Sequence, residues 1–313
     1  GMCGTVFKLS SHTDGSWTES VLYAFCPLKG CSDGAAPYSK LIFDQAGNLY
    51  GTANQGGTGS HCVSCGVVFE LTPQPNGSWT ESVLYNFCSM SNCSDGWYPA
   101  ASVLLDTKGN LYGTALYGGN PQCNGPNGCG VVFKLTKKKD GSWTQTVLHA
   151  FAGKDGSFPY APVILDQAGN LYGTTSGGGS AGCDFDCGVV FELSPNADGS
   201  WTEKTLHEFT GGTDGGEPFA GLILDQAGSL YGTTVTAGSP RRGPCSPYGC
   251  GVVFRLSPSS DGGWRETVLH RFLDQPGDNP YASDLIFDGE GNLFGTTAGD
   301  GSKTFGSVFV VTP

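Results

Sequence analysis

The chain has 313 residues, and its 51 Gly and 18 Pro exclude a helical bundle, because both residue types interrupt helices. Hydrophobic residues make up 38% and aromatic residues 12%, which is enough to build a core and excludes a disordered chain. The net charge of −12 argues against nucleic acid as a partner, since phosphate binding needs clustered cations, and no apolar run reaches the ~18–20 residues that insertion into a membrane requires.

One unit recurs five times along the chain. The hexamer Gly-Asn-Leu-Tyr-Gly-Thr begins at Gly47 and recurs, with small changes, at Gly109, Gly169, Gly228 and Gly291. A Trp and a Val-Phe pair keep the same spacing, so the five units fill residues 1–313 and predict one domain.

Each unit predicts four short strands, taken here in chain order from the first complete copy. Residues 41–44 form an apolar run that ends in Asp and predicts a strand buried on both faces. A turn at 44–48 leads to a second strand at 49–52, and a Gly-rich loop leads to a third at 67–71. Residues 79–85 alternate polar and apolar, which is typical of a half-exposed edge strand.

Four-stranded units in tandem predict an all-β fold, a β-propeller of five four-stranded blades with about 60 residues per repeat. A linear β-solenoid is the alternative, but its coils are shorter and contain fewer hairpins. The chain starts on a third strand, 3–9, and ends on another, 306–312. We expect the N-terminal fourth strand, 16–25, to close the ring by pairing with the C-terminal third strand, which leaves the N-terminal third strand either surplus or sharing an edge.

Twelve of the 13 cysteines follow the repeat as close pairs. The pairs are Cys26/Cys31, Cys62/Cys65, Cys88/Cys93, Cys123/Cys129, Cys183/Cys187 and Cys245/Cys250. A zinc site would keep its ligand spacing fixed, whereas these spacings vary, so we predict six loop-stapling disulfides and no metal. The scheme leaves Cys3 as the odd cysteine, which predicts that its partner lies upstream of residue 1 in a longer native chain.

The repeated motifs resemble those of the tandem-repeat proteins called GloVer-repeat proteins. The residues that carry the resemblance are Gly-Asn-Leu-Tyr-Gly-Thr, Cys-Gly-Val-Val-Phe, Gly-Ser-Trp-Thr-Glu and Asp-Gly-x-x-Pro-Tyr. The strand order is also similar to that of NHL-type propeller repeats. The resemblance implies a secreted bacterial protein with a repeat fold, located outside the cell or on its surface, and implies no catalytic residues.

Positions where the repeats differ on the loop face are the candidates for function. The loop before the first strand carries Asp-Gly in four of the five repeats, and we interpret it as a turn rather than as a ring of cation ligands. The residue before its Pro varies, and so does the residue at the predicted channel mouth. The first set is Ala36, Tyr98, Phe158, Glu217 and Asn279, and the second is Lys40, Ser102, Pro162, Gly221 and Asp284.

Aromatic and charged residues also gather on the predicted loops. They are Trp97, Tyr98, Tyr117, Phe185 and Tyr248, with Asp184, Asp186, Arg241 and Arg242 beside them. Such a surface suits stacking on sugar rings; the alternative is that these rings pack against their own disulfide loops. The Trp of each fourth strand is expected to pack between blades, and His149, His207 and His270 take the place of Tyr23 and Tyr85.

These observations predict a secreted, non-catalytic propeller that binds glycan or another extracellular polymer and uses no cofactor. The first alternative is a carbohydrate-active enzyme, a glycoside hydrolase or lyase, with carboxylates drawn from Asp184, Asp186, Glu217 and Asp284. The second is a structural or filament-forming surface protein that self-associates through its edge strands.

Overall fold

The computed structural model describes residues 3–27, 29–61, 64–179, 187–238, 249–273, 279–281, 284–299 and 305–313. The chain forms two compact units, Gly1–Ala150 and Phe151–Pro313, which we call unit 1 and unit 2. No helix of the described residues is long and apolar enough to cross a membrane.

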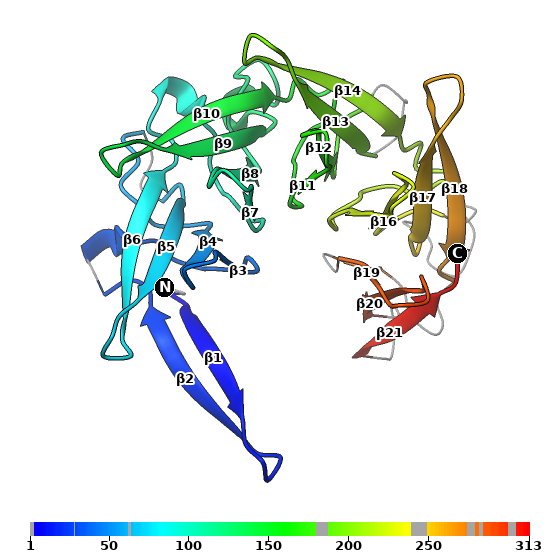
Figure 1. Cartoon of the computed structure of the whole chain (residues 1–313). Coiled ribbons are helices and arrows are strands. Elements are labelled where there is room, and N and C mark those ends of the chain that lie inside the picture. The colour runs from blue at the N-terminus through cyan, green and yellow to red at the C-terminus, as the bar shows by residue number, and fades with distance from the viewer. Residues whose placement is uncertain are drawn as a thin grey trace. The chain divides into compact units, whose positions relative to one another are not determined.

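Unit 1 contains a hairpin and two four-stranded antiparallel sheets (Figure 1). The hairpin pairs β1 (Thr5–Ser11) with β2 (Trp17–Ala24). The sheets are β3 (Ile42–Phe43), β4 (Leu49–Ala53), β5 (Val67–Pro73) and β6 (Trp79–Asn86), then β7 (Leu104–Leu105), β8 (Leu111–Ala115), β9 (Val131–Lys137) and β10 (Trp143–Ala150). Short 3-10 helices are η1 (Lys29–Cys31), η2 (Ser91–Cys93) and η3 (Gly125–Asn127).

Unit 2 contains two four-stranded sheets and a three-stranded one, all antiparallel. They are β11 (Ile164–Leu165), β12 (Leu171–Thr175), β13 (Val189–Pro195) and β14 (Trp201–Glu208), then β15 (Ile223–Leu224), β16 (Leu230–Thr234), β17 (Val252–Pro258) and β18 (Trp264–Arg271), then β19 (Ile286–Phe287), β20 (Leu293–Gly299) and β21 (Phe305–Val311). Strands pair in chain order within each sheet, which is the topology of propeller blades. The fold is the predicted all-β, five-bladed β-propeller with four-stranded blades.

The two ends of the chain depart from the expected pairing. β2 pairs with β1 along its whole length, and β21 pairs with β20. The N-terminal third strand, β1, was expected to be surplus, but it pairs with the N-terminal fourth strand, β2. As a result, the last sheet has three strands in the described part of the chain.

The first strands are shorter and more exposed than predicted. β3 has only two residues, and its Phe43 is exposed. The strand ends early because the carboxylate of Asp44 accepts hydrogen bonds from the backbone N–H groups of Ala46 (2.8 Å) and Asn48 (2.9 Å) and folds the chain into a turn. The strands buried on both faces are the second and the third: every residue of β4 is buried, and in β5 Val67, Val68 and Phe69 are fully buried.

The structure explains why several residues of the hexamer recur in each repeat. The Asn48 amide and the Tyr50 hydroxyl both donate to the Asp44 carboxylate, at 2.8 and 3.2 Å. Gly51 lies directly against the next strand, where a Cβ would stand 2.8 Å from Cζ of Phe69. Thr52 donates 2.8 Å to the backbone carbonyl of Ala101 in the next repeat. The hexamer therefore closes a turn, admits an aromatic ring and ties one sheet to the next.

Alternation along the third strand gives each sheet two apolar faces. Val68 points toward the next sheet along the chain and Phe69 toward the preceding one. We call these the following face and the preceding face. In unit 1 the following face of β3–β6 supplies Ile42, Tyr50, Val68 and Leu84, and the preceding face of β7–β10 meets it with Val103, Leu111, Phe133, Leu135, Trp143 and Val147. Trp79, Trp143 and Trp264 thus pack between sheets, as predicted, whereas Trp17 of the hairpin is 64% exposed.

A carboxyl group lies buried between the hairpin and the first sheet of unit 1. Asp33 is 1% exposed. Burial, and then the nearby charge of Asp33, raise the pKa of Glu81 to about 7. Asp33 Oδ1 and Glu81 Oε1 are buried without a hydrogen-bond partner among the described residues. Gln145 has the position of Glu81 in the next sheet, and its amide donates 3.0 Å to the Asp95 carbonyl.

Truncating the repeated Phe should cost stability only where a sheet covers it. Phe69→Ala removes a ring that is 0% exposed, so we expect a loss of about 3–5 kcal/mol. Phe7→Ala removes the equivalent ring of β1, which is 53% exposed, and should cost less than about 1 kcal/mol. Urea unfolding followed by circular dichroism measures both; equal losses would contradict the assignment of the faces.

Glu81→Gln should stabilise the protein at alkaline pH. Because the folded-state pKa of Glu81 lies above its ordinary value of 4.5, folding binds a proton, and stability falls as pH rises from about 4.5 through about 7. The Gln variant lacks this loss, so its advantage in unfolding free energy should grow between pH 5 and pH 8. The control is Glu19→Gln, an exposed equivalent on β2. An advantage that does not change with pH would refute the shift.

Candidate functional site

Disulfides hold the loops from which a site would be built. Three predicted bonds are present, Cys26–Cys31, Cys88–Cys93 and Cys123–Cys129. Cys65, Cys187 and Cys250 are also disulfide-bonded, while their predicted partners Cys62, Cys183 and Cys245 lie outside the described residues. Disulfides persist in oxidising compartments, so the chain belongs to an oxidising environment.

In the first two repeats, the Sγ atom of a third cysteine also lies close to a disulfide. The Sγ atoms of Cys65, Cys88 and Cys93 lie within 4.8 Å of one another, and so do those of Cys3, Cys26 and Cys31. Cys3 therefore has the same place beside the Cys26–Cys31 disulfide as Cys65 has beside Cys88–Cys93.

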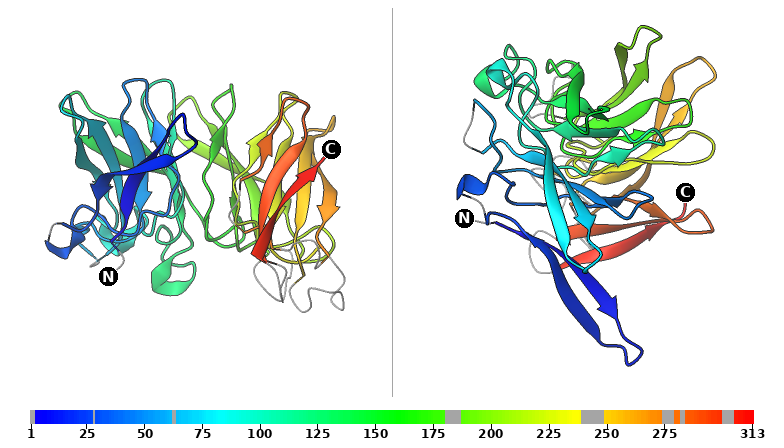
Figure 2. Two further views of the ribbon diagram at one scale, coloured as in Figure 1. Left: turned by 90° about the horizontal axis from the view of Figure 1, so that it is seen from below. Right: turned by 60° about the vertical axis from the view of Figure 1, so that its left-hand side comes forward.

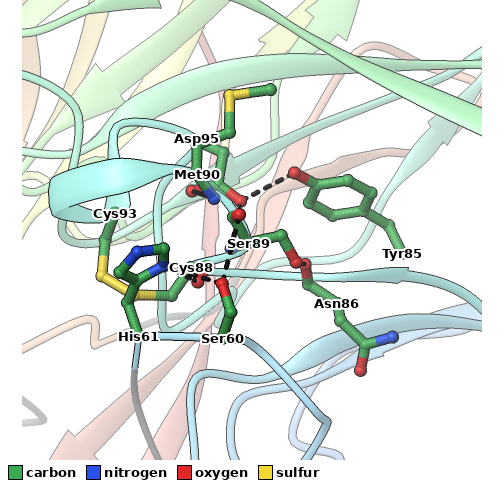
Figure 3. The surroundings of a disulfide bond; sticks show 9 residues. All are labelled: Ser60, His61, Tyr85, Asn86, Cys88, Ser89, Met90, Cys93 and Asp95. Carbon is green, nitrogen blue, oxygen red and sulfur yellow. Dashed lines mark hydrogen bonds between the residues drawn. A yellow bond between two sulfur atoms is a disulfide. The ribbon is translucent and has the colours of Figure 1, made fainter.

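The Asp of each Asp-Gly turn shapes its own loop, which we call the lead-in loop because it precedes a first strand. Figure 3 shows Asp95 beside the Cys88–Cys93 disulfide, where it accepts hydrogen bonds from the Tyr85 hydroxyl (2.7 Å) and the Ser89 amide (2.8 Å). Asp33 accepts in the same way from Tyr23 (2.9 Å). Burial, and then the hydrogen bond to the Asp carboxylate, raise the pKa of both tyrosines. Asp33 and Asp95 thus accept hydrogen bonds from their own loops, as expected for turn residues.

His207 replaces the tyrosine in one repeat of unit 2. Its Nε2 lies 3.6 Å from Oδ2 of Asp214. Burial acts to raise the pKa of Asp214, but the contacts with His207 and Thr210 outweigh it and lower this pKa to about 2. His207 thus contacts the Asp of its lead-in loop, as Tyr23 and Tyr85 do in the first two repeats.

The residue before the loop proline has an unusual backbone conformation in every repeat. Tyr98, Phe158 and Glu217 have φ values of 61°, 59° and 53°, in the left-handed region that non-glycine residues rarely adopt. The backbone N–H of Tyr98 donates a 2.9 Å hydrogen bond to the carbonyl of Cys65, and the backbone N–H of Glu217 donates one of 2.9 Å to the carbonyl of Cys187. The backbone at this position therefore stabilises the loop, while the side chain varies between repeats.

Three aromatic side chains meet on the lead-in loops of unit 2. Tyr160 precedes β11, Phe219 precedes β15 and Tyr281 precedes β19, so each comes from a different sheet. Ring centroids are 5.5 Å apart for Tyr160 and Phe219, 5.0 Å for Phe219 and Tyr281, and 6.4 Å for Tyr160 and Tyr281. Tyr281 is 45% exposed, and the other two are half-buried. We call these three residues the aromatic cluster.

Polar ties fix the loops that carry the aromatic cluster. The Thr174 hydroxyl donates 3.2 Å to the carbonyl of Ala220, next to Phe219. The Thr233 hydroxyl donates 3.3 Å to the carbonyl of Pro280, next to Tyr281. Each tie joins a second strand to the lead-in loop of the following repeat, so the spacing of the rings is set by the packing of the sheets.

A carboxylate lies on the same set of loops. Asp284 is exposed, and its Oδ1 accepts a 2.9 Å hydrogen bond from the backbone N–H of Gly221. A Cβ on Gly221 would lie 2.6 Å from that oxygen and 3.2 Å from Cγ of Pro162. Pro162, Gly221 and Asp284, three of the predicted channel-mouth positions, are therefore in contact in unit 2. Lys40 is an exposed residue of unit 1.

A second group of aromatic residues lies in unit 1 and includes three predicted site residues. Trp97 and Tyr117 stack with centroids 4.5 Å apart, and Tyr98 meets Tyr117 at 6.0 Å. Trp97 also packs against the core that contains Cys88 and Cys65. These rings cover each other and the disulfide loop, which is the alternative that the sequence left open for them.

Several predicted residues cannot be placed. Asp184, Phe185, Asp186, Arg241, Arg242 and Tyr248 lie outside the described residues. Conversely, Tyr160, Phe219 and Tyr281 were not predicted as site residues, because they follow the loop proline, whereas the residue that varies most between repeats precedes it. The signal was present, since the motif Asp-Gly-x-x-Pro-Tyr places an aromatic residue after this proline in four of the five repeats.

Solved structures similar to this chain include three enzymes. A glucose dehydrogenase matches with a TM-score of 0.51 and 12% identity, over 97% of this chain and 90% of its own. An exo-1,5-α-L-arabinanase from a bovine ruminal metagenomic library matches with a TM-score of 0.40 and 13% identity, over 89% and 93%. A β-fructofuranosidase of Bombyx mori, solved with sucrose, matches with a TM-score of 0.45 and 11% identity, over 88% of this chain and 58% of the enzyme.

The likeness to the dehydrogenase shows the propeller fold alone, since identity is low. None of the curated proteins matches the chain. The Gloeobacter/Verrucomicrobia repeat, in contrast, matches residues 1–244 and 122–313. Because these two ranges together cover all five repeats, the chain belongs to the Gloeobacter/Verrucomicrobia repeat family.

Proposed function

We propose that this protein is a secreted, non-catalytic propeller that binds an extracellular glycan through the aromatic cluster of unit 2. The observation that carries the proposal is the convergence of Tyr160, Phe219 and Tyr281 from three sheets, with Tyr281 45% exposed. Aromatic faces suit the apolar faces of sugar rings, and a few fixed polar groups select among hydroxyl patterns.

Asp284 supplies the polar group next to the cluster. One of its oxygens accepts the Gly221 amide, which fixes the carboxylate in place. The second oxygen is then oriented to accept hydrogen bonds from sugar hydroxyls. A carboxylate fixed in this way suits recognition of a neutral polysaccharide, because a uronic acid would bring a like charge to the site.

The disulfides support the proposed location outside the cytoplasm. Several short loops are stapled, including Cys26–Cys31 and Cys123–Cys129, and such bonds form in oxidising compartments. A polymer outside the cytoplasm is therefore the natural ligand class. The binding experiment described next therefore compares neutral with acidic polysaccharides.

Removing the exposed ring should weaken glycan binding without unfolding the protein. We expect Tyr281→Ala to lower the affinity for a neutral polysaccharide about fivefold, since one aromatic contact contributes about 1 kcal/mol. The measurement is a polysaccharide array followed by titration calorimetry on the best ligand. The matched control is Phe43→Ala, which removes an exposed ring of β3 in unit 1. Absence of binding across the array, or equal affinities of Tyr281→Ala and wild type, would sink the proposal.

Gly221→Ala tests the part played by Asp284. The added methyl displaces the Asp284 carboxylate, because a Cβ would lie 2.6 Å from its Oδ1. We expect affinity to fall several-fold while the circular dichroism spectrum stays unchanged, and Asp284→Asn should weaken binding less because an amide oxygen still accepts hydroxyl protons. If Gly221→Ala binds as well as wild type, Asp284 takes no part in recognition.

A further inference from the structure

Two disulfides of unit 1 meet beside the lead-in loop of the second repeat. Cys88 and Cys93 form one of them, and Cys65 belongs to the other. The Sγ atoms of these three residues all lie within 4.8 Å of one another. Disulfides exchange partners when a thiolate attacks a disulfide sulfur, so a small side-chain rotation brings these two bonds close enough to exchange.

The three sulfur-bearing residues differ in their access to solvent. Cys88 is fully buried, Cys65 is 1% exposed, and Cys93 is half-buried. A thiol in solution therefore reaches the Sγ of Cys93 first, and Cys88 becomes the leaving group. The thiolate that this attack leaves on Cys88 is then buried beside the sulfur of Cys65.

The short loop between Cys88 and Cys93 also holds its backbone in an unfavourable conformation. Cys88 has a φ of 57° and Cys93 has a φ of 48°, both in the left-handed region that non-glycine residues rarely adopt. The bond closes a ring over a sequence separation of only 5. Breaking it frees both residues to leave this conformation, and strained or exposed disulfides are the labile ones.

The strand register brings Cys65 and Cys88 to the same end of one strand pair. Val67 of β5 pairs with Asn86 of β6, and the two strands form an antiparallel hairpin (Figure 2). Cys65 stands just before β5 and Cys88 just after β6, so the two cysteines flank that pair. A bond between Cys65 and Cys88 would therefore join neighbouring strands directly across their end.

We propose that Cys65, Cys88 and Cys93 form a thiol–disulfide exchange site, at which Cys88 changes partner from Cys93 to Cys65 when a small thiol attacks. Small thiols are the substrate class because the half-buried Cys93 is the point of entry. The exchange replaces a bond within one loop by a bond between two strands, and the new ring is longer. In the chain-entropy model a longer ring stabilises the fold more.

The exchange needs no oxidant. In the first step the external thiolate attacks Sγ of Cys93, a mixed disulfide forms there, and the electron pair of the broken bond stays on Cys88 as a thiolate. In the second step Cys88 attacks Sγ of Cys65, and the former partner of Cys65, predicted to be Cys62, leaves as a thiolate. Two disulfides and one thiolate enter the sequence, and two disulfides and one thiolate leave it.

The third repeat differs at this place and provides a control. Its strands β9 and β10 pair in the same way as β5 and β6, but Ala152 takes the place of Cys88. In the part of the chain that the structure describes, no third cysteine brings its sulfur within 4.8 Å of both atoms of the Cys123–Cys129 bond.

Cys93→Ser tests the exchange without added thiol, because it removes the first partner of Cys88. Thiols are alkylated in denaturant, and the peptides are mapped by mass spectrometry without reduction. We expect a Cys65–Cys88 crosslink in most molecules, together with an alkylated Cys62. Wild type incubated with reduced glutathione should give the same crosslink, with glutathione attached to Cys93.

The matched control is Cys129→Ser, which should leave Cys123 alkylated and form no new crosslink. An alkylated Cys88 in Cys93→Ser, with Cys65 still in its original disulfide, overturns the proposal. Glutathione-treated wild type that loses the Cys88–Cys93 bond without forming the Cys65–Cys88 crosslink also overturns it, and this arm does not depend on the folding of a variant.

Discussion

The alternation of Val and Phe along the third strand is the constraint on which the structure depends. Because successive side chains of a strand point to opposite faces, Val68 and Phe69 oblige one sheet to be covered on both sides. The sheet β3–β6 in unit 1 and the sheet β15–β18 in unit 2 each have a neighbour on both sides, and their third strands bury the Val and the Phe alike. Stability and the spacing of the loops both follow from this one pattern.

Much of the fold could be predicted from the sequence, because the signals are repeated and local. The hexamer predicts a turn at Asp44, and the variable Cys spacings predict disulfides such as Cys123–Cys129, which are present. The pairing at the chain ends could not be predicted, since β1 and β21 are the same type of strand and compete for β2. The short first strands were also missed, because an apolar run does not reveal how early the Asp44 turn ends it.

The candidate site was predicted less well than the fold. Aromatic residues on loops were identified, but Trp97 and Tyr117 stack on each other, which no sequence pattern distinguishes from stacking on a ligand. The cluster of Tyr160, Phe219 and Tyr281 depends on three loops that lie about 60 residues apart in sequence and meet only through the packing of their sheets. Thr174 and Thr233, which belong to the scaffold motif, tie those loops in place.

Hydrogen exchange of the third-strand amides tests the central claim directly. The claim is that a sheet is stable in proportion to the covering of both of its faces. Amides of β5 and β17 should exchange far more slowly than amides at the same register of β1, where Phe7 is exposed, because local opening is easiest where one face is bare. Equal protection of these three strands would contradict the account.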